Sequence, residues 1–164
     1  MFSVAGDVTL SDVGFYGICL SATTGGNVLS DSGALLVDSP ADGIFFLNSG
    51  SMTLPACSVL YAALRGIHFQ FGGELRATGG STRFNGEEGV FLNAGGMAEL
   101  TNGFISDNSD AGLLALYGGR GSVAGATIDS NGQAGLVCES NSSVYAVGCI
   151  ITGSTTTGID SSYD

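Results

Sequence analysis

Two acidic side chains have a spacing that suits acid–base chemistry. Glu87 and Asp110 lie 23 residues apart, and Glu88 directly follows Glu87. If the backbone repeats with that period, their carboxylates would approach to about 5 Å, the separation in retaining glycosidases. Like charges that close raise the pKa of one partner, as a general acid requires. We therefore predict Glu87 and Asp110 as a catalytic pair; exposed turn carboxylates without a role, or a shared calcium site, are the alternatives.

The remaining charged side chains suggest structural roles. His68 has no Asp or Ser partner at matching spacing, which favours packing over catalysis. Arg76 and Glu99 are also 23 residues apart and predict a surface ion pair worth at most ~1 kcal/mol. Arg83 and Asp129 lie two such intervals apart, which places them about 10 Å from each other, and we expect them to line a polar groove.

Cysteines and motifs point to no cofactor. The four cysteines, at 19, 57, 138 and 149, form no CxxC pair and lack zinc-like spacing, so we interpret them as small core residues. A Cys138–Cys149 disulfide stays open. Calcium has no specific motif in its favour, because the nonapeptide of calcium-binding β-helices is absent. Asn141-Ser142-Ser143 matches an N-glycosylation acceptor.

The elements that position these residues belong to a repeat. A Gly followed by an aliphatic residue recurs at intervals of 26 and then five times 23 residues. These Gly residues are Gly17, Gly43, Gly66, Gly89, Gly112, Gly135 and Gly158. Within each repeat apolar residues alternate with a period of two, which predicts short strands at positions two to six, nine to thirteen and fifteen to nineteen, counted from the Gly. No helical spacing extends beyond one turn.

Equivalent positions predict stacked columns. Position two holds Ile18, Ile44, Ile67, Val90, Leu113, Leu136 and Ile159, and position four holds Leu20, Phe46, Phe69, Leu92, Ala115 and Cys138. Position seventeen, from Val59 onward, extends back to Leu36 and Leu10. Asn85, Asn108 and Asn131 share position twenty and predict a buried corner ladder. Leu113→Asp is expected to prevent folding.

An apolar column also lies on the opposite face of the first strand. Position three holds Cys19, Phe45, His68, Phe91, Leu114 and Val137, with Leu47 and Leu116 two positions further on. A strand that is apolar on both faces is normally covered on both. We interpret this column as a subunit interface, most simply in a side-by-side homotrimer. Cover by a segment outside the sequence is the alternative, and a sugar-stacking strip is a third.

This pattern predicts an all-β, single-stranded parallel solenoid of about seven coils, one domain over residues 1–164. We divide it into a partial coil (1–16), an irregular coil (17–42), five 23-residue coils (43–157) and the start of another (158–164). The repeat continues to both ends without a capping helix, so we expect the chain to be a fragment of a longer protein. One Gly per coil also accounts for much of the count of 28.

Composition excludes some partners. Four Arg, no Lys and fifteen acids give a net charge of −11, which disfavours nucleic acid and anionic membranes. No apolar run is long enough to insert in a membrane, and the first residues do not match a signal peptide.

A 23-residue coil of three strands resembles the right-handed parallel β-helix of the pectin-lyase-like superfamily, over about residues 8 to 160. Gly135–Ala146 resembles coils of bacteriophage tailspikes and tail fibres, which implies a trimeric, extracellular or virion-surface protein that binds cell-surface polysaccharide. Ile105–Gly112 resembles the repeats of autotransporter-type bacterial adhesins, the alternative. A carbohydrate-active enzyme (lyase, hydrolase or epimerase) is the second alternative, disfavoured because no Asp cluster surrounds an Arg.

Overall fold

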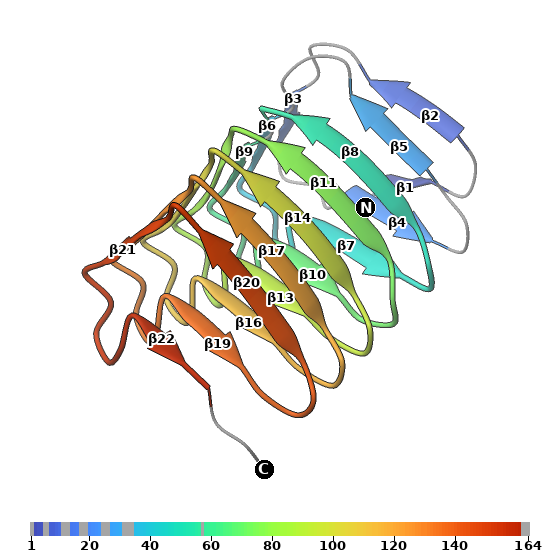
Figure 1. Ribbon diagram of the computed structural model, residues 1–164. Coiled ribbons are helices and arrows are strands. Elements are labelled where there is room, and N and C mark those ends of the chain that lie inside the picture. The colour runs from blue at the N-terminus through green and yellow to red at the C-terminus, as the bar shows by residue number, and fades with distance from the viewer. Residues whose placement is uncertain are drawn as a thin grey trace.

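The chain forms a parallel β-solenoid in the computed structural model (Figure 1). The structure describes the strands at 2–4, 7–10, 14–16, 20–23, 27–30 and 35–37, then 38–56 and 58–161, with side chains at 38–46, 48–56 and 58–161. Three sheets run along this part, one per side of each coil, and every strand pairs in parallel with the equivalent strand one coil away. No helix occurs among the described residues.

Sheet A comprises β1 (Phe2–Val4), β4 (Leu20–Thr23), β7 (Ile44–Leu47), β10 (Ile67–Phe69), β13 (Val90–Leu92), β16 (Leu113–Ala115), β19 (Leu136–Cys138) and β22 (Ile159–Asp160). Sheet B comprises β2 (Asp7–Leu10), β5 (Asn27–Ser30), β8 (Ser51–Pro55), β11 (Glu74–Thr78), β14 (Met97–Thr101), β17 (Arg120–Ala124) and β20 (Ser143–Val147). Sheet C comprises β3 (Gly14–Tyr16), β6 (Leu35–Val37), β9 (Ser58–Leu60), β12 (Ser81–Arg83), β15 (Phe104–Ser106), β18 (Thr127–Asp129) and β21 (Ile150–Thr152).

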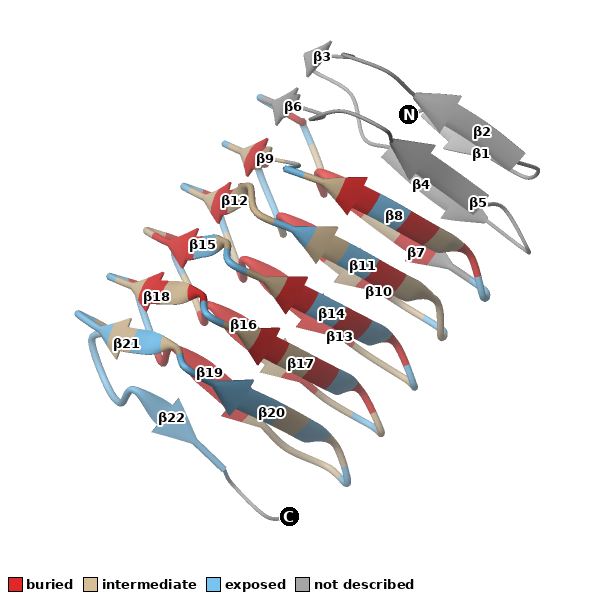
Figure 2. Cartoon of the chain, turned by 45° about the horizontal axis from the view of Figure 1, so that its top comes forward, coloured by how far each residue is buried: buried red, intermediate tan, exposed pale blue. Residues whose placement is uncertain are grey.

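The predicted columns from residue 43 onward are confirmed by the strand register. Ile67 pairs with Ile44 and Val90, and Val90 pairs with Leu113. Their side chains fill the interior, where Phe46 and Phe69 stack with ring centroids 4.2 Å apart. Figure 2 shows buried and exposed residues alternating along β8, β14 and β17, as expected for strands with one face toward a core.

The predicted alignment of the first coils is wrong, by two residues in sheet A and by five in sheet C. Leu20, expected at position four, pairs with Ile44 at position two, and Ser21 rather than Cys19 pairs with Phe45. Leu10 lies in β2 of sheet B, and Phe15 takes its expected place opposite Leu36. Leu20 and Ile44 are 24 residues apart rather than 26, so the Gly at 17 is not the register marker that later Gly residues are. Ile18 and Cys19 themselves lie outside the described residues.

The predicted asparagine ladder is confirmed. Asn85 Nδ2 donates to Asn108 Oδ1 at 2.8 Å, and Asn108 Nδ2 donates to Asn131 Oδ1 at 2.9 Å. The same oxygens accept the backbone N–H groups of Asn85 and Asn108, and Asn108 Nδ2 also donates to the Thr82 carbonyl. All three carboxamides are buried, so the ladder satisfies backbone groups that the corner leaves without sheet partners.

The lack of room for a side chain explains why a Gly opens each coil. A Cβ on Gly66 would lie 2.6 Å from the Gly89 carbonyl oxygen and 2.7 Å from Asn85 Nδ2. One on Gly112 would lie 2.6 Å from the Gly135 oxygen and 2.8 Å from Asn131 Nδ2. The ladder therefore occupies the volume that a side chain would need, and this corner accepts only Gly.

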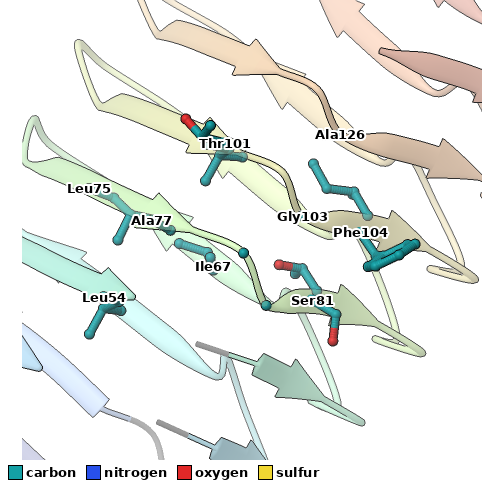
Figure 3. Close-up of a pocket in the computed structure, with 14 residues that line it drawn as sticks. Leu54, Ile67, Leu75, Ala77, Ser81, Thr101, Gly103, Phe104 and Ala126 are labelled. Atoms are coloured by element: carbon teal, nitrogen blue, oxygen red, sulfur yellow. The ribbon is translucent and has the colours of Figure 1, made fainter. Parts of the chain in front are cut away.

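Small residues leave a partly open gap at the corner between sheets B and C (Figure 3). The cavity measures about 30 Å³ and is mostly apolar. Ala77 lies where the neighbouring coils have Leu54 and Leu100, and Gly103 lies where the next coil has Ala126. Its mostly apolar lining offers a water molecule few hydrogen-bond partners.

Candidate functional site

The position-three column is partly covered by the chain's own corners. Leu114 packs against Val137 together with Ala111 and Ala134, which belong to the corner between sheets C and A. Phe91 and Val137 are only 9% and 7% exposed. At Phe91 and Val137 the chain's own corner therefore supplies cover that we expected from a partner subunit, whereas Phe45, His68 and Leu114 in the same column are only partly buried. The side chain of Leu47 lies outside the described residues, and Leu116 is half-buried.

In the preceding coils, charged side chains form ion pairs and hydrogen bonds at the same corner. We call Asp42, Arg65, His68, Glu87 and Glu88 the corner cluster. Arg65 Nε donates to Glu88 Oε2 at 2.9 Å, and its Nη2 lies 2.8 Å from Glu87 Oε2, an ion pair whose N–H is not aligned as a hydrogen bond. The corner cluster links three successive coils.

His68 has an acidic partner that the 23-residue spacing did not predict. Its Nδ1 lies 3.0 Å from Asp42 Oδ2, while Asp42 Oδ1 accepts the Arg65 backbone N–H at 3.1 Å. The imidazole lies between the rings of Phe45 and Phe91, with centroids 5.0 and 5.2 Å away. The packing role predicted for His68 agrees with these contacts, and its Asp partner lies 26 residues away, outside the repeat interval on which the prediction was based.

Glu88 lies largely buried in the corner cluster, beside other charged groups. Burial raises the pKa of Glu88 above its ordinary 4.5, and the charges of Asp110 and Glu87 act in the same direction. Its own backbone N–H and the Arg65 guanidinium oppose that rise in the Glu88 pKa. The Arg65 guanidinium also lies over the Phe91 ring, 4.7 Å from its centroid.

The structure turns Glu87 and Asp110 toward different partners. Both lie at the predicted column position, and the Asp110 N–H donates to the Glu87 carbonyl. The Glu87 carboxylate pairs with Arg65 of the preceding coil, whereas Asp110 Oδ1 accepts from Gln133 Nε2 of the following coil at 2.6 Å. Neither Glu87 nor Asp110 lines any of the four hollows identified among the described residues, whose volumes range from about 30 to 450 Å³.

The pH dependence of stability separates Glu88 from Asp107. The folded-state pKa of Glu88 is raised, so the folded protein binds more protons between pH 4.5 and that pKa, and stability falls as pH rises through this range. The pKa of Asp107 is lowered below 3.8 by hydrogen bonds from Arg83 and Ser106, so its contribution to stability is present above pH 3.8 and is lost as pH falls.

We therefore expect Glu88→Gln and Asp107→Asn to change the pH profile with opposite signs. Relative to Glu88→Gln, the native chain should lose stability as pH rises above 4.5; relative to Asp107→Asn, it should gain stability as pH rises from 2 toward 4. Because each substitution removes one titrating group, the difference in unfolding free energy between the native chain and the variant can change by at most about 1.4 kcal/mol per pH unit. Urea unfolding between pH 2 and 7 measures both. Equal slopes for the two variants would contradict the assigned environments.

The outer face of sheet B carries an open surface groove, with both polar and apolar lining, that the sequence did not predict. Two hollows of about 410 and 320 Å³ adjoin there, and both are lined by Glu99. Arg76 Nη2 lies 2.8 Å from Glu74 Oε1, and Arg76 Nε lies 3.5 Å from Glu99 Oε2. We call the two hollows together the sheet B groove; its polar lining consists of Glu74, Arg76, Glu99 and Arg120 with Thr53, Thr78, Thr101 and Ser122.

Sheet C presents aromatic rings beside a second ion pair. Tyr61 and Phe84 stack with centroids 5.1 Å apart, and both are substantially exposed. Arg83 lies over Phe84 and pairs with Asp107 at 3.0 Å. Asp129 accepts from Thr152 Oγ1 at 2.7 Å.

The described residues offer no evident place for a metal. No group of three or more His, Cys, Asp or Glu side chains converges among them. Cys138 and Cys149 are free thiols, whereas Cys57, like Cys19, falls outside the described part. Within the same part of the chain, no helix is long and apolar enough to cross a membrane.

The architecture defines a class of protein, an all-β parallel solenoid with three strands per coil. Residues 42–163 match the family described as right handed beta helix region, and the chain belongs to that family. No curated protein and no solved structure matches the sequence. Family membership supports a β-helix domain of the structural and carbohydrate-binding type.

Proposed function

We propose that this chain is a rigid, receptor-binding β-helix rod that holds a cell-surface glycan in the sheet B groove. The observation that carries the proposal is the groove itself, two adjoining hollows with carboxylates, guanidinium groups and hydroxyls on one face. Binding sites for small ligands are concave and carry a few fixed polar groups, and the volumes here fall in their usual range.

The chemistry of the groove suits the hydroxyl groups of a sugar. Carboxylate oxygens of Glu74 and Glu99 accept hydrogen bonds from hydroxyls, and Arg76 donates them. Arg76 is fixed between the two acids, so less of its conformational freedom is lost on binding. The net charge of −11 favours a neutral glycan over a polyuronate.

The place of this rod in a viral tailspike or tail fibre, at the virion surface, is part of the same proposal. A homotrimer would align three such grooves and increase avidity for a repeating polymer. Because sheet A is partly covered by its own corners, the exposed apolar groups that favour side-by-side contact are instead Tyr61, Phe84 and Phe104 on sheet C.

Binding to immobilised neutral polysaccharides tests the proposal. Arg76→Ala and Glu99→Ala should each weaken retention by about tenfold or more, because each removes charge-assisted hydrogen bonds worth about 1.5–3 kcal/mol. Both side chains are more than 60% exposed, so folding should be unaffected.

Arg83→Ala is the matched control, an arginine with an ion pair on sheet C. It should bind as the native chain does. Loss of binding only in Arg83→Ala would move the site to sheet C, and failure to retain any neutral glycan would reject the proposed function.

A further inference from the structure

The sequence contains three Asn-Gly pairs, at Asn85-Gly86, Asn102-Gly103 and Asn131-Gly132. In such a pair the backbone nitrogen of Gly can attack the asparagine side-chain carbonyl, because Gly has no side chain to obstruct the approach. The reaction requires a free carboxamide and a backbone N–H that is not engaged elsewhere. The solenoid places the three pairs in two very different corners.

Two of the pairs are locked in the ladder. The carboxamides of Asn85 and Asn131 are 1% exposed and hydrogen-bonded along the ladder. The nucleophilic nitrogens are also engaged, because Gly86 N donates to the Ala62 carbonyl at 2.9 Å and Gly132 N donates to the Asn108 carbonyl at 2.8 Å. Either pair can react only after its corner opens.

In the third pair, Asn102-Gly103, neither reacting group is held by a hydrogen bond to another described residue. Asn102 is exposed at the corner between β14 and β15, with a positive φ of 54°. Within the described residues neither its carboxamide nor the Gly103 N–H has a hydrogen-bond partner, although Asn102 N donates to the Ala124 carbonyl at 2.8 Å. Gly103 also borders the cavity between sheets B and C (Figure 3).

We propose that Asn102 is a site of spontaneous deamidation in the folded protein. Gly103 N bonds to Asn102 Cγ, the Cγ–Nδ2 bond breaks, and ammonia leaves with the Gly103 amide proton. Water then opens the resulting five-membered imide at either carbonyl and gives Asp or isoaspartate. Both products add a negative charge at the corner between sheets B and C, and isoaspartate also lengthens the backbone there.

Peptide mapping by mass spectrometry after incubation at pH 8.5 and 37 °C tests this proposal. In the folded chain Asn102 should convert at least about thirty times faster than Asn85 or Asn131, because the latter two must first break buried hydrogen bonds. In denaturant the three sites should react at similar rates, since they share one local sequence. Asn102→Gln and Gly103→Ala should each suppress the product.

Comparable rates at the three sites in the folded chain would overturn the proposal. So would an unreacted Asn102 under conditions in which the denatured chain converts. Neither outcome depends on glycan binding, so the result is independent of the proposed function.

Discussion

Leu113→Asp is expected to abolish folding. Leu113 is fully buried in β16, between Val90 and Leu136 of the adjacent coils. An unpaired carboxylate there must lose its hydration or be protonated, at a cost comparable to the whole stability of a domain, about 5–15 kcal/mol. Neighbouring coils have no separate core, so the defect spreads along the solenoid. Circular dichroism and size-exclusion chromatography measure the outcome.

Ile150→Asp is the control for this substitution. Ile150 also lies in a strand but is 60% exposed, so an added carboxylate stays hydrated. We expect this variant to retain its β-sheet spectrum. A folded Leu113→Asp protein, or equal loss of structure in both variants, would contradict the assigned core.

Asn108→Ala is expected to destabilise the folded chain by about 3 kcal/mol, within a range of about 2–5, because several buried groups lose partners together. The substitution removes the acceptor of the Asn85 N–H and Asn85 Nδ2, and the donor to Asn131 Oδ1 and the Thr82 carbonyl. Urea unfolding measures the difference. Asn108→Asp should also be destabilising, and less so at low pH, where the buried acid is neutral.

Asn102→Gly is the matched control in the same coil. Asn102 is exposed with a positive φ, a conformation that Gly adopts freely, so the change should stay within about 1 kcal/mol. If Asn108→Ala were as mild as this control, the ladder would contribute nothing to stability.

The sequence predicts the regular coils and the ladder well, because each column repeats the same chemistry at one fixed interval. Leu113 and Asn108 occupy their predicted places for that reason. The irregular first coils could not be aligned in the same way. Once corner lengths vary, a Gly no longer marks the register, and Leu20 aligns by its apolar alternation instead.

Part of the corner cluster escaped prediction because two of its contacts run diagonally between coils, His68 with Asp42 and Arg65 with Glu87. Asp42 directly precedes the coil that contains β7, whereas His68 lies in β10 of the following coil, so their separation is 26 residues and not one repeat. Arg65 and Glu88 are one repeat apart, and their spacing was a usable signal. The sequence does contain an indication that a corner covers part of sheet A. The residue before each Gly changes from Asp42, Arg65 and Glu88 to Ala111 and Ala134, which indicates a corner that packs rather than faces solvent.

The sheet B groove escaped prediction for another reason. An Arg76–Glu99 pair at the repeat interval indicates only an exposed ion pair, and Glu74 lies on the same strand as Arg76. Concavity arises from how side chains of adjacent coils differ in size, which no single column reveals.

Amide chemical-shift mapping during titration with a neutral oligosaccharide tests the central claim most directly. If sheet B binds the glycan, the perturbed amides will lie in β8, β11, β14 and β17, which line the groove. The corner cluster and the Tyr61–Phe84 stack should remain unchanged. Perturbations centred on His68 and Glu88, or on sheet C, would contradict the assignment and place the binding surface on another side of the solenoid.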